Sequence, residues 1–165
     1  EVLIFMKLRR IKESLKTSGK FIEQRNFFKL AAKLVDYGIA SVWLPNDSLG
    51  ADFLAVQHYD YNRDCSNIYQ IQLKARMSLS LKYKGKDIYL AFPLDDSNSG
   101  KNWVIIKHDT LERLYFSHPK SRSKFESLEA FCTKNSSDSW SNNSVPKYMV
   151  DDVIDNSIIG KIDID

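Results

Sequence analysis

The fold of this chain is decided by two runs, GADFLAV at residues 50–56 and YQIQLKAR at residues 69–76. In the second run apolar and polar residues alternate, which is the period of two expected of a strand with one buried face. The link at residues 57–68 is rich in Asn, Asp, Ser and Arg, a composition typical of a hairpin connection. The two runs are therefore expected to pair as antiparallel neighbours.

Three polar side chains of these runs are expected to meet if the strands pair in this way. Asp52 stands at the start of the first run, and Gln72 and Lys74 lie on the polar face of the second run. Antiparallel pairing could bring Asp52 close to Lys74. An acid, an amide and an amine would then share one patch of the surface.

This arrangement resembles the PD-(D/E)xK nuclease superfamily, in which an Asp at the head of one strand is followed on the next by an acidic residue, any residue and Lys. Here the Asp is Asp52 and the second half-motif is QLK at residues 72–74. Ala51 stands where the family name has Pro, and Gln72 replaces the usual carboxylate. The similarity extends to YKGKDIYLAFP and WVIIKHD and covers about residues 21–114. It implies a magnesium-dependent endonuclease that hydrolyses phosphodiester bonds in DNA.

The resemblance also implies a role for each residue of the patch. Asp52 would be the main ligand of Mg²⁺ or Mn²⁺, joined by the amide oxygen of Gln72 and the backbone carbonyl of Leu73, because hard cations prefer oxygen. Lys74 would position the attacking water, help to deprotonate it and stabilise the charged transition state. In this superfamily the first helix often supplies a Glu toward the metal, and Glu23 best matches that position. Alternatively, Glu23 is a surface acid favoured in a first turn by the helix dipole.

The pattern along the whole chain predicts an α/β fold, with a central mixed sheet of four or five strands flanked by helices. The resemblance implies that this is a restriction-endonuclease-like core. At 165 residues the chain fits a single domain, with the core at about residues 20–116 and a helical extension at about residues 120–165. Strands are predicted at residues 39–44, 50–56, 69–76, 87–92 and 103–106. Helices are predicted at residues 20–37, 123–132 and 146–155, and a further helix is predicted to begin at an Asp109 cap. Residues 77–86 fit either a strand or a connection, and residues 133–144 are predicted to form a linker.

Four cations that follow the paired runs are candidates for contact with DNA, namely Arg76, Lys82, Lys84 and Lys86. Cationic side chains displace condensed counterions and so hold a protein on a phosphate backbone without reading sequence. A solvated strand edge guarded by Lys would have the same composition. The net charge of +3, from 24 basic and 21 acidic residues, permits either interpretation.

The composition argues against several other classes of protein. No apolar run approaches the ~20 residues that a membrane-spanning helix needs, so a cytoplasmic protein without a membrane partner is expected. Cys65 and Cys132 lie far apart, which favours free thiols over a disulfide framework or a zinc site. The sequence contains neither a nucleophile-elbow pattern around a Ser nor a Gly-rich phosphate loop.

Two rival functions stay open beside the nuclease. The chain could be a catalytically inactive module that keeps the nuclease scaffold and binds nucleic acid in a salt-sensitive manner. It could also use its aromatic surface to bind a protein partner, and a homodimer is compatible with the sequence.

Overall fold

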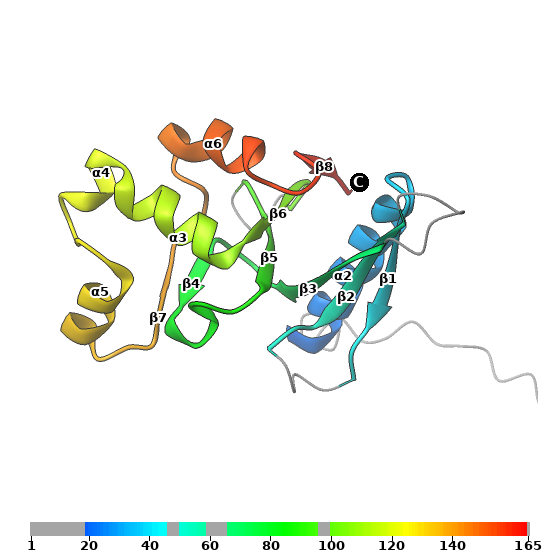
Figure 1. Cartoon of the computed structure of the whole chain (residues 1–165), viewed down its shortest axis with the longest axis horizontal. Coiled ribbons are helices and arrows are strands. Elements are labelled where there is room, and N and C mark those ends of the chain that lie inside the picture. Colours follow the sequence, from blue (N-terminus) through cyan, green and yellow to red (C-terminus); the bar gives the residue numbers. More distant parts are fainter. Residues whose placement is uncertain (1–18, 46–49, 59–65, 96–99, 165) are drawn as a thin grey trace, which may run out of the picture.

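The computed structural model describes residues 19–45, 50–58, 66–95 and 100–164, and it shows a curled mixed sheet with helices on both faces (Figure 1). The sheet has six strands in the order β1-β2-β3-β5-β6-β8. β3 and β5 run parallel, and every other neighbouring pair is antiparallel. The strands are β1 (Ile39–Trp43), β2 (Phe53–His58), β3 (Ser66–Leu73), β5 (Ile88–Pro93), β6 (Asn102–Lys107) and β8 (Ile162–Asp163).

The predicted α/β class is confirmed, whereas the predicted number of strands is too small. The expected sheet had four or five strands, and β8, near the end of the chain, adds a further one. A second, two-stranded sheet pairs β4 (Ser78–Ser80) with β7 (Ser139–Ser141), although residues 133–144 were predicted to be a linker. Strands of two or three residues are too short to show a periodic pattern, so only their pairing reveals them. The restriction-endonuclease-like core stays a prediction.

Helix α2 (Gly19–Val35) covers one face of the sheet and builds the first of two cores. Phe27, Leu30 and Leu34 are buried on its inner side, with the Phe27 ring 5.2 Å from the ring of Phe53. Gly38, at φ +70°, makes the turn into β1 in a conformation that other residues rarely adopt. The predicted helix at residues 20–37 therefore lies within two residues of the observed bounds.

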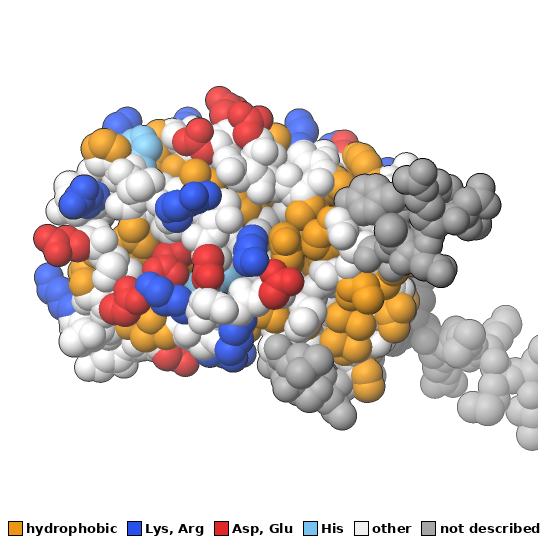
Figure 2. All heavy atoms as spheres, in the orientation of Figure 1, with side chains coloured by type: hydrophobic (Ala, Val, Ile, Leu, Met, Phe, Trp, Pro, Cys, Tyr) orange, Lys and Arg blue, Asp and Glu red, His pale blue; other side chains and the backbone are white. Residues whose placement is uncertain are grey.

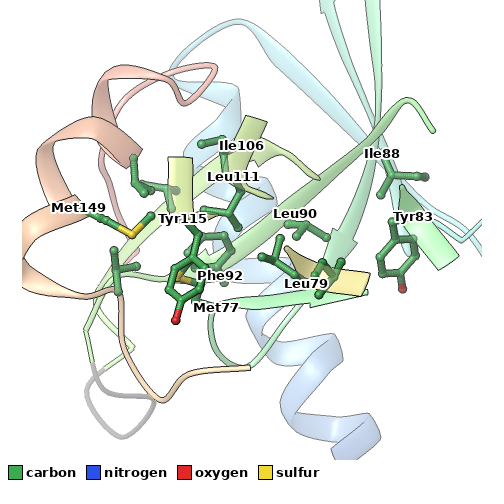
Figure 3. Packing of buried hydrophobic residues seen from close by; sticks show 14 of the residues in the cluster. Met77, Leu79, Tyr83, Ile88, Leu90, Phe92, Ile106, Leu111, Tyr115 and Met149 are labelled. Carbon is green, nitrogen blue, oxygen red and sulfur yellow. The ribbon is translucent and has the colours of Figure 1, made fainter. Parts of the chain in front are cut away.

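The second core lies on the opposite face, under the helices that follow β6. These helices are α3 (His108–Ser117), α4 (Pro119–Arg122), α5 (Leu128–Asn135) and α6 (Val150–Asp155), and the short 3₁₀ turns η1 (Leu81–Tyr83) and η2 (Lys147–Met149) join the same layer. Leu90, Phe92 and Ile106 of the sheet pack there against Leu111 of α3. Figure 3 shows this cluster, with Tyr83 at one end and Met149 at the other.

The surface is mixed in character. Figure 2 shows acidic and basic side chains interspersed over the region where Figure 1 places α3 and α5, and hydrophobic side chains over β1 and β2. Val42 of β1 and Ile68 of β3 are exposed on the face of the sheet that α2 leaves uncovered. Among the described helices, none combines the length and the apolar character needed to cross a membrane. Cys132 is buried as a free thiol, and Cys65 lies outside the described residues.

Replacing Leu30 with Ala should test the α2 core. Leu30 is fully buried between the helix and the sheet, so Leu30→Ala should lower the free energy of unfolding by about 2–5 kcal/mol through lost burial and a residual cavity. Val35→Ala is the matched control, since Val35 is 66% exposed on the same helix and its loss should cost less than about 0.5 kcal/mol. Urea unfolding measures both, and equal costs would contradict this packing.

Candidate functional site

The end of the β2–β3 hairpin places Asp52 beside Gln72. Phe53 pairs with Ile71 in the last regular pair of the ladder, and Asp52 and Gln72 are the next residues on the two segments. The Asp52 backbone N–H donates to the Ile71 carbonyl at 2.8 Å. Phe53 and Ile71 point into the α2 core, whereas Gln72, the next residue of β3, points to the opposite face.

The carboxylate of Asp52 is held by two donors from β3. Its Oδ2 accepts a hydrogen bond from the Leu73 backbone N–H at 2.7 Å and another from the Gln72 side-chain amide. The same Gln72 Nε2 lies 3.5 Å from the Leu73 carbonyl oxygen. Both side chains are nearly removed from solvent, with 9% of Asp52 and 7% of Gln72 exposed. The predicted ligands Asp52, Gln72 and Leu73 thus meet at one point.

Tyr83 joins this pair to Lys74. The Tyr83 hydroxyl donates to Gln72 Oε1 at 3.0 Å and accepts from Lys74 Nζ at 3.3 Å. A continuous chain of hydrogen bonds therefore runs from the Lys74 ammonium through Tyr83 and Gln72 to the Asp52 carboxylate. Each member has its donors and acceptors correctly oriented, and such chains gain strength when partly buried.

Tyr83 was not predicted as a site residue, although it is 1% exposed and sits at the centre of the chain. Its position in a lysine-rich run suggested either a contact with a nucleic-acid backbone or a solvated strand edge, and no periodic pattern indicated burial. Gly50 lets the backbone pass close to its ring, because a Cβ added there would lie 3.3 Å from Tyr83 Cε1 and the residue has φ +79°. The Tyr83 ring also lies edge-on to the buried His108 ring, at 5.8 Å between centroids.

The oxygens present suit a hard cation only if one amide turns. As the structure stands, the Gln72 NH₂ group faces both the Asp52 carboxylate and the Leu73 carbonyl. Rotating the amide would turn Oε1 toward the same two oxygens and leave three oxygen ligands facing one another, an arrangement that a cation stabilises. In the present orientation the Gln72 NH₂ group faces the two oxygens that a cation would need.

Glu23 lines a hollow that Gln72 and Leu73 also line. The hollow, of about 420 Å³, is lined by Ile22, Glu23 and Asn26 of α2 and by Gln72, Leu73 and Lys74 at the end of β3. Glu23 is half-buried in the first turns of α2 rather than fully exposed on its surface. The helix thus places a second carboxylate beside the hollow that Gln72 and Lys74 line.

The four candidate DNA-binding cations have different surroundings. Arg76 donates to Asn143 Oδ1 at 3.0 Å, and Lys82 Nζ lies 4.7 Å from the centre of the Tyr83 ring. Lys84 bridges Glu112, at 2.7 Å, and Glu129, and these bonds raise the pKa of its ammonium group. Lys86 is exposed. The charge of Lys84 is therefore balanced by two neighbouring carboxylates. Of the four candidates, Arg76 and Lys82 line the same groove as Lys74.

A second polar cluster, His108, Asp109 and Glu112, brings its ligand-type atoms within 4.8 Å of one another. His108 Nε2 accepts from the Ser80 backbone N–H at 3.2 Å, so His108 Nδ1 carries the proton that it shares with Asp109 at 3.0 Å. Although burial acts to raise it, the pKa of Asp109 is lowered by hydrogen bonds from His108 and the Gly85 backbone. These hydrogen bonds hold His108 and Asp109 in place beside the Tyr83 ring, so the cluster has a structural role.

Asp109 does not cap α3 as predicted. The helix begins at His108, and its N-cap residue is Lys107, two residues before Asp109; Lys107 makes no side-chain cap hydrogen bond. The Asp109 carboxylate instead accepts from the Gly85 backbone N–H at 3.1 and 3.2 Å, across the turn after η1. A tertiary hydrogen bond has replaced the local one that the sequence suggested.

Comparison of the chain with protein-family models, with curated proteins and with solved structures gave no match in any of the three.

Replacing Tyr83 with Phe should test the hydrogen-bond chain. The change removes only the hydroxyl and leaves the buried Gln72 Oε1 without its donor, so the free energy of unfolding should fall by about 1–3 kcal/mol. Tyr37→Phe is the matched control, because Tyr37 is 46% exposed and should change stability by less than about 0.5 kcal/mol. Urea unfolding at neutral pH measures the stability of both variants. If Tyr83→Phe had the same free energy of unfolding as the wild type, the hydroxyl would not link Lys74 to Gln72 energetically.

Proposed function

We propose that this protein is a metal-dependent nuclease that hydrolyses phosphodiester bonds in DNA, with its site at the end of the β2–β3 hairpin. The observation that carries the proposal is the hydrogen-bond chain from Lys74 through Tyr83 and Gln72 to Asp52. It holds an acid and an amine on one face of the sheet, as the resemblance to the PD-(D/E)xK superfamily requires. A fold alone does not specify an activity, so the proposal depends on these side chains.

The cation would be held by oxygens of Asp52, Gln72 and Leu73, and Glu23 lines the hollow that Gln72 and Leu73 also line. Bound there, Mg²⁺ would lower the pKa of a coordinated water and offset charge on the phosphate. Asp52 supplies the carboxylate, and the Leu73 N–H at 2.7 Å fixes the orientation of that carboxylate. Glu23 compensates in part for the charge that Gln72 lacks.

Lys74 would act on the phosphate and on the attacking water. Its ammonium group is only partly buried, and it lies where the hollow beside Glu23 meets the space beside Tyr83. A cation held in a partly desolvated site stabilises negative charge more strongly than one in bulk water. The Tyr83 hydroxyl at 3.3 Å limits the positions that Lys74 Nζ can take.

One observation favours a second candidate function, a nucleic-acid-binding module without catalysis. The Gln72 amide and the Leu73 N–H already hydrogen-bond the Asp52 carboxylate, so Asp52 has protein partners without a cation. In that case Asp52 and Gln72 would serve to join β2 to β3. Chelating agents would then leave DNA binding unchanged, and no divalent ion would produce cleavage.

Removing either charged member should abolish cleavage. Asp52→Asn takes away the carboxylate ligand and Lys74→Met takes away the ammonium group, so each should reduce Mg²⁺-dependent nicking of a supercoiled plasmid by about 10²-fold or more. EDTA should stop the wild-type reaction. Circular dichroism should show that both variants keep the wild-type fold.

The control for this experiment is Lys161→Met, which removes the same charge from an exposed position just before β8. It should nick DNA at the wild-type rate. Full activity in folded Asp52→Asn and Lys74→Met proteins would overturn the proposed site, and a wild-type protein without activity in either Mg²⁺ or Mn²⁺ would favour the inactive module.

Gln72→Glu should convert the site into a tighter cation site. Without metal, two neighbouring carboxylates would repel each other, so the variant should have a lower Tm than the wild type in EDTA. Adding Mg²⁺ should raise its Tm by more than that of the wild type, because a ligand that binds only the folded state stabilises it by about 2.7 kcal/mol at about 100 times its Kd.

Gln70→Glu is the matched control, since Gln70 points to the same face of β3 but pairs with Leu54. Its Tm should respond to Mg²⁺ no more than the wild type does. The same response in both variants would mean that Asp52, Leu73 and residue 72 do not form a cation site.

A further inference from the structure

A polar groove begins at Lys74 and runs along the small β4–β7 sheet. It has a volume of about 370 Å³, and Figure 1 shows the two strands that form its wall side by side. Its lining includes the cationic residues Lys74, Arg76 and Lys82 and the serines Ser78, Ser139 and Ser141. Since Lys74 also lines the hollow beside Glu23, the groove leads directly away from the candidate site.

The charge of the groove suits an anion. Its lining carries three cations, Lys74, Arg76 and Lys82, and one acid, Asp138, so its formal net charge is 3 − 1 = +2. The lining of the neighbouring groove beside α3 instead mixes Lys84 and Arg113 with Asp109 and Glu112, for a formal net charge of 2 − 2 = 0. Positive charge therefore collects on the side of the molecule that adjoins Lys74.

The strand pairing adds a row of hydroxyl groups to this charge. Ser78 pairs with Ser141 and Ser80 pairs with Ser139, so the four hydroxyls stand on one face of the two-stranded sheet. Leu79 and Trp140 alternate with them, and the Trp140 ring packs 4.2 Å from that of Tyr115. Because Trp140 is engaged in this packing, the groove offers donors for phosphate oxygens rather than an open aromatic platform for bases.

We propose that this groove, which we call the β4–β7 groove, holds the phosphodiester backbone of the nucleic-acid strand that continues from the scissile phosphate. The inference rests on the proposed nuclease function and specifies where its substrate lies. Lys82 and Arg76 contact successive phosphates, and Ser139 and Ser141, which are exposed, donate hydrogen bonds to phosphate oxygens. Binding through the backbone alone should depend on salt and not on base sequence.

The test is fluorescence anisotropy of a short fluorescein-labelled oligodeoxythymidine in EDTA, so that neither a cation nor cleavage contributes. The double variant Arg76→Glu with Lys82→Glu should bind about tenfold more weakly, because two attractions become repulsions. A plot of log K against log salt should be flatter by about 1.4, at about 0.7 for each lost phosphate contact to a single strand. A mixed-sequence oligonucleotide should give the same result.

The matched control is Lys161→Glu with Arg122→Glu, which changes the net charge equally at two exposed positions outside the groove. It should keep near-wild-type affinity and salt dependence. Equal weakening in the two double variants would reveal an effect of net charge alone and overturn the groove. Absence of oligonucleotide binding by the wild type at low salt would overturn it as well.

A second pair of single variants tests the groove if the double variant Arg76→Glu with Lys82→Glu does not fold. Ser141→Glu places one negative charge in the groove, and Ser117→Glu places the same charge at the exposed end of α3. Only Ser141→Glu should weaken binding, and unchanged binding would count against the groove. If the protein binds the oligonucleotide through the groove but cleaves no DNA, the groove is upheld and the nuclease is rejected. If the protein cleaves DNA and all groove variants bind as the wild type does, the nuclease is upheld and the groove is rejected.

Discussion

The hydrogen bonds that join Asp52 to Gln72 and to the Leu73 backbone determine how the rest of the site is arranged. They close the β2–β3 hairpin at its open end, beyond the last regular pair of the ladder. A carboxylate that is almost fully buried needs such partners, because leaving it unpaired away from water would cost several kcal/mol. The register of the hairpin is thereby tied to the position of one acid, since a slip by one residue would turn Asp52 into the α2 core.

The same pair makes the site sensitive to the identity of residue 72. A carboxylate there would repel Asp52 and create a demand for a cation, whereas the amide of Gln72 satisfies Asp52 directly. The amide has two ends, and in this structure its oxygen is held by Tyr83. Metal binding would require the Gln72 amide to rotate and lose its present hydrogen bonds. It therefore depends on whether the attraction between the oxygen ligands and a hard cation outweighs that loss.

The surroundings of Tyr83 connect this balance to the second core. Its ring is packed among hydrophobic residues (Figure 3) and lies edge-on to His108, and its hydroxyl donates to Gln72 Oε1. His108 is itself held by the Ser80 backbone and by Asp109. Residues of η1, β4 and α3 therefore support the candidate site, whose residues lie at the ends of β2 and β3, and the β4–β7 groove starts beside Tyr83.

Much of the local structure could be predicted from the sequence alone. The alternation in residues 69–76 indicated a half-buried strand, the apolar spacing of residues 20–37 indicated α2, and the polar link between the two runs indicated a hairpin. These features depend on periodicity and turn composition, which act between residues close in the chain. Asp52, Gln72 and Lys74 were candidates for the same reason.

Only the tertiary structure decided what lies between and around those candidates. Tyr83 links Gln72 to Lys74 across eleven and nine positions of the chain, β7 pairs with β4 from residues that looked like a linker, and Lys84 is neutralised by Glu112 and Glu129. Such contacts leave no periodic trace, because each joins single residues that folding brings together from distant segments. The sequence by itself determined which strand face is polar; the packing of η1 against that face decided which of its groups share hydrogen bonds.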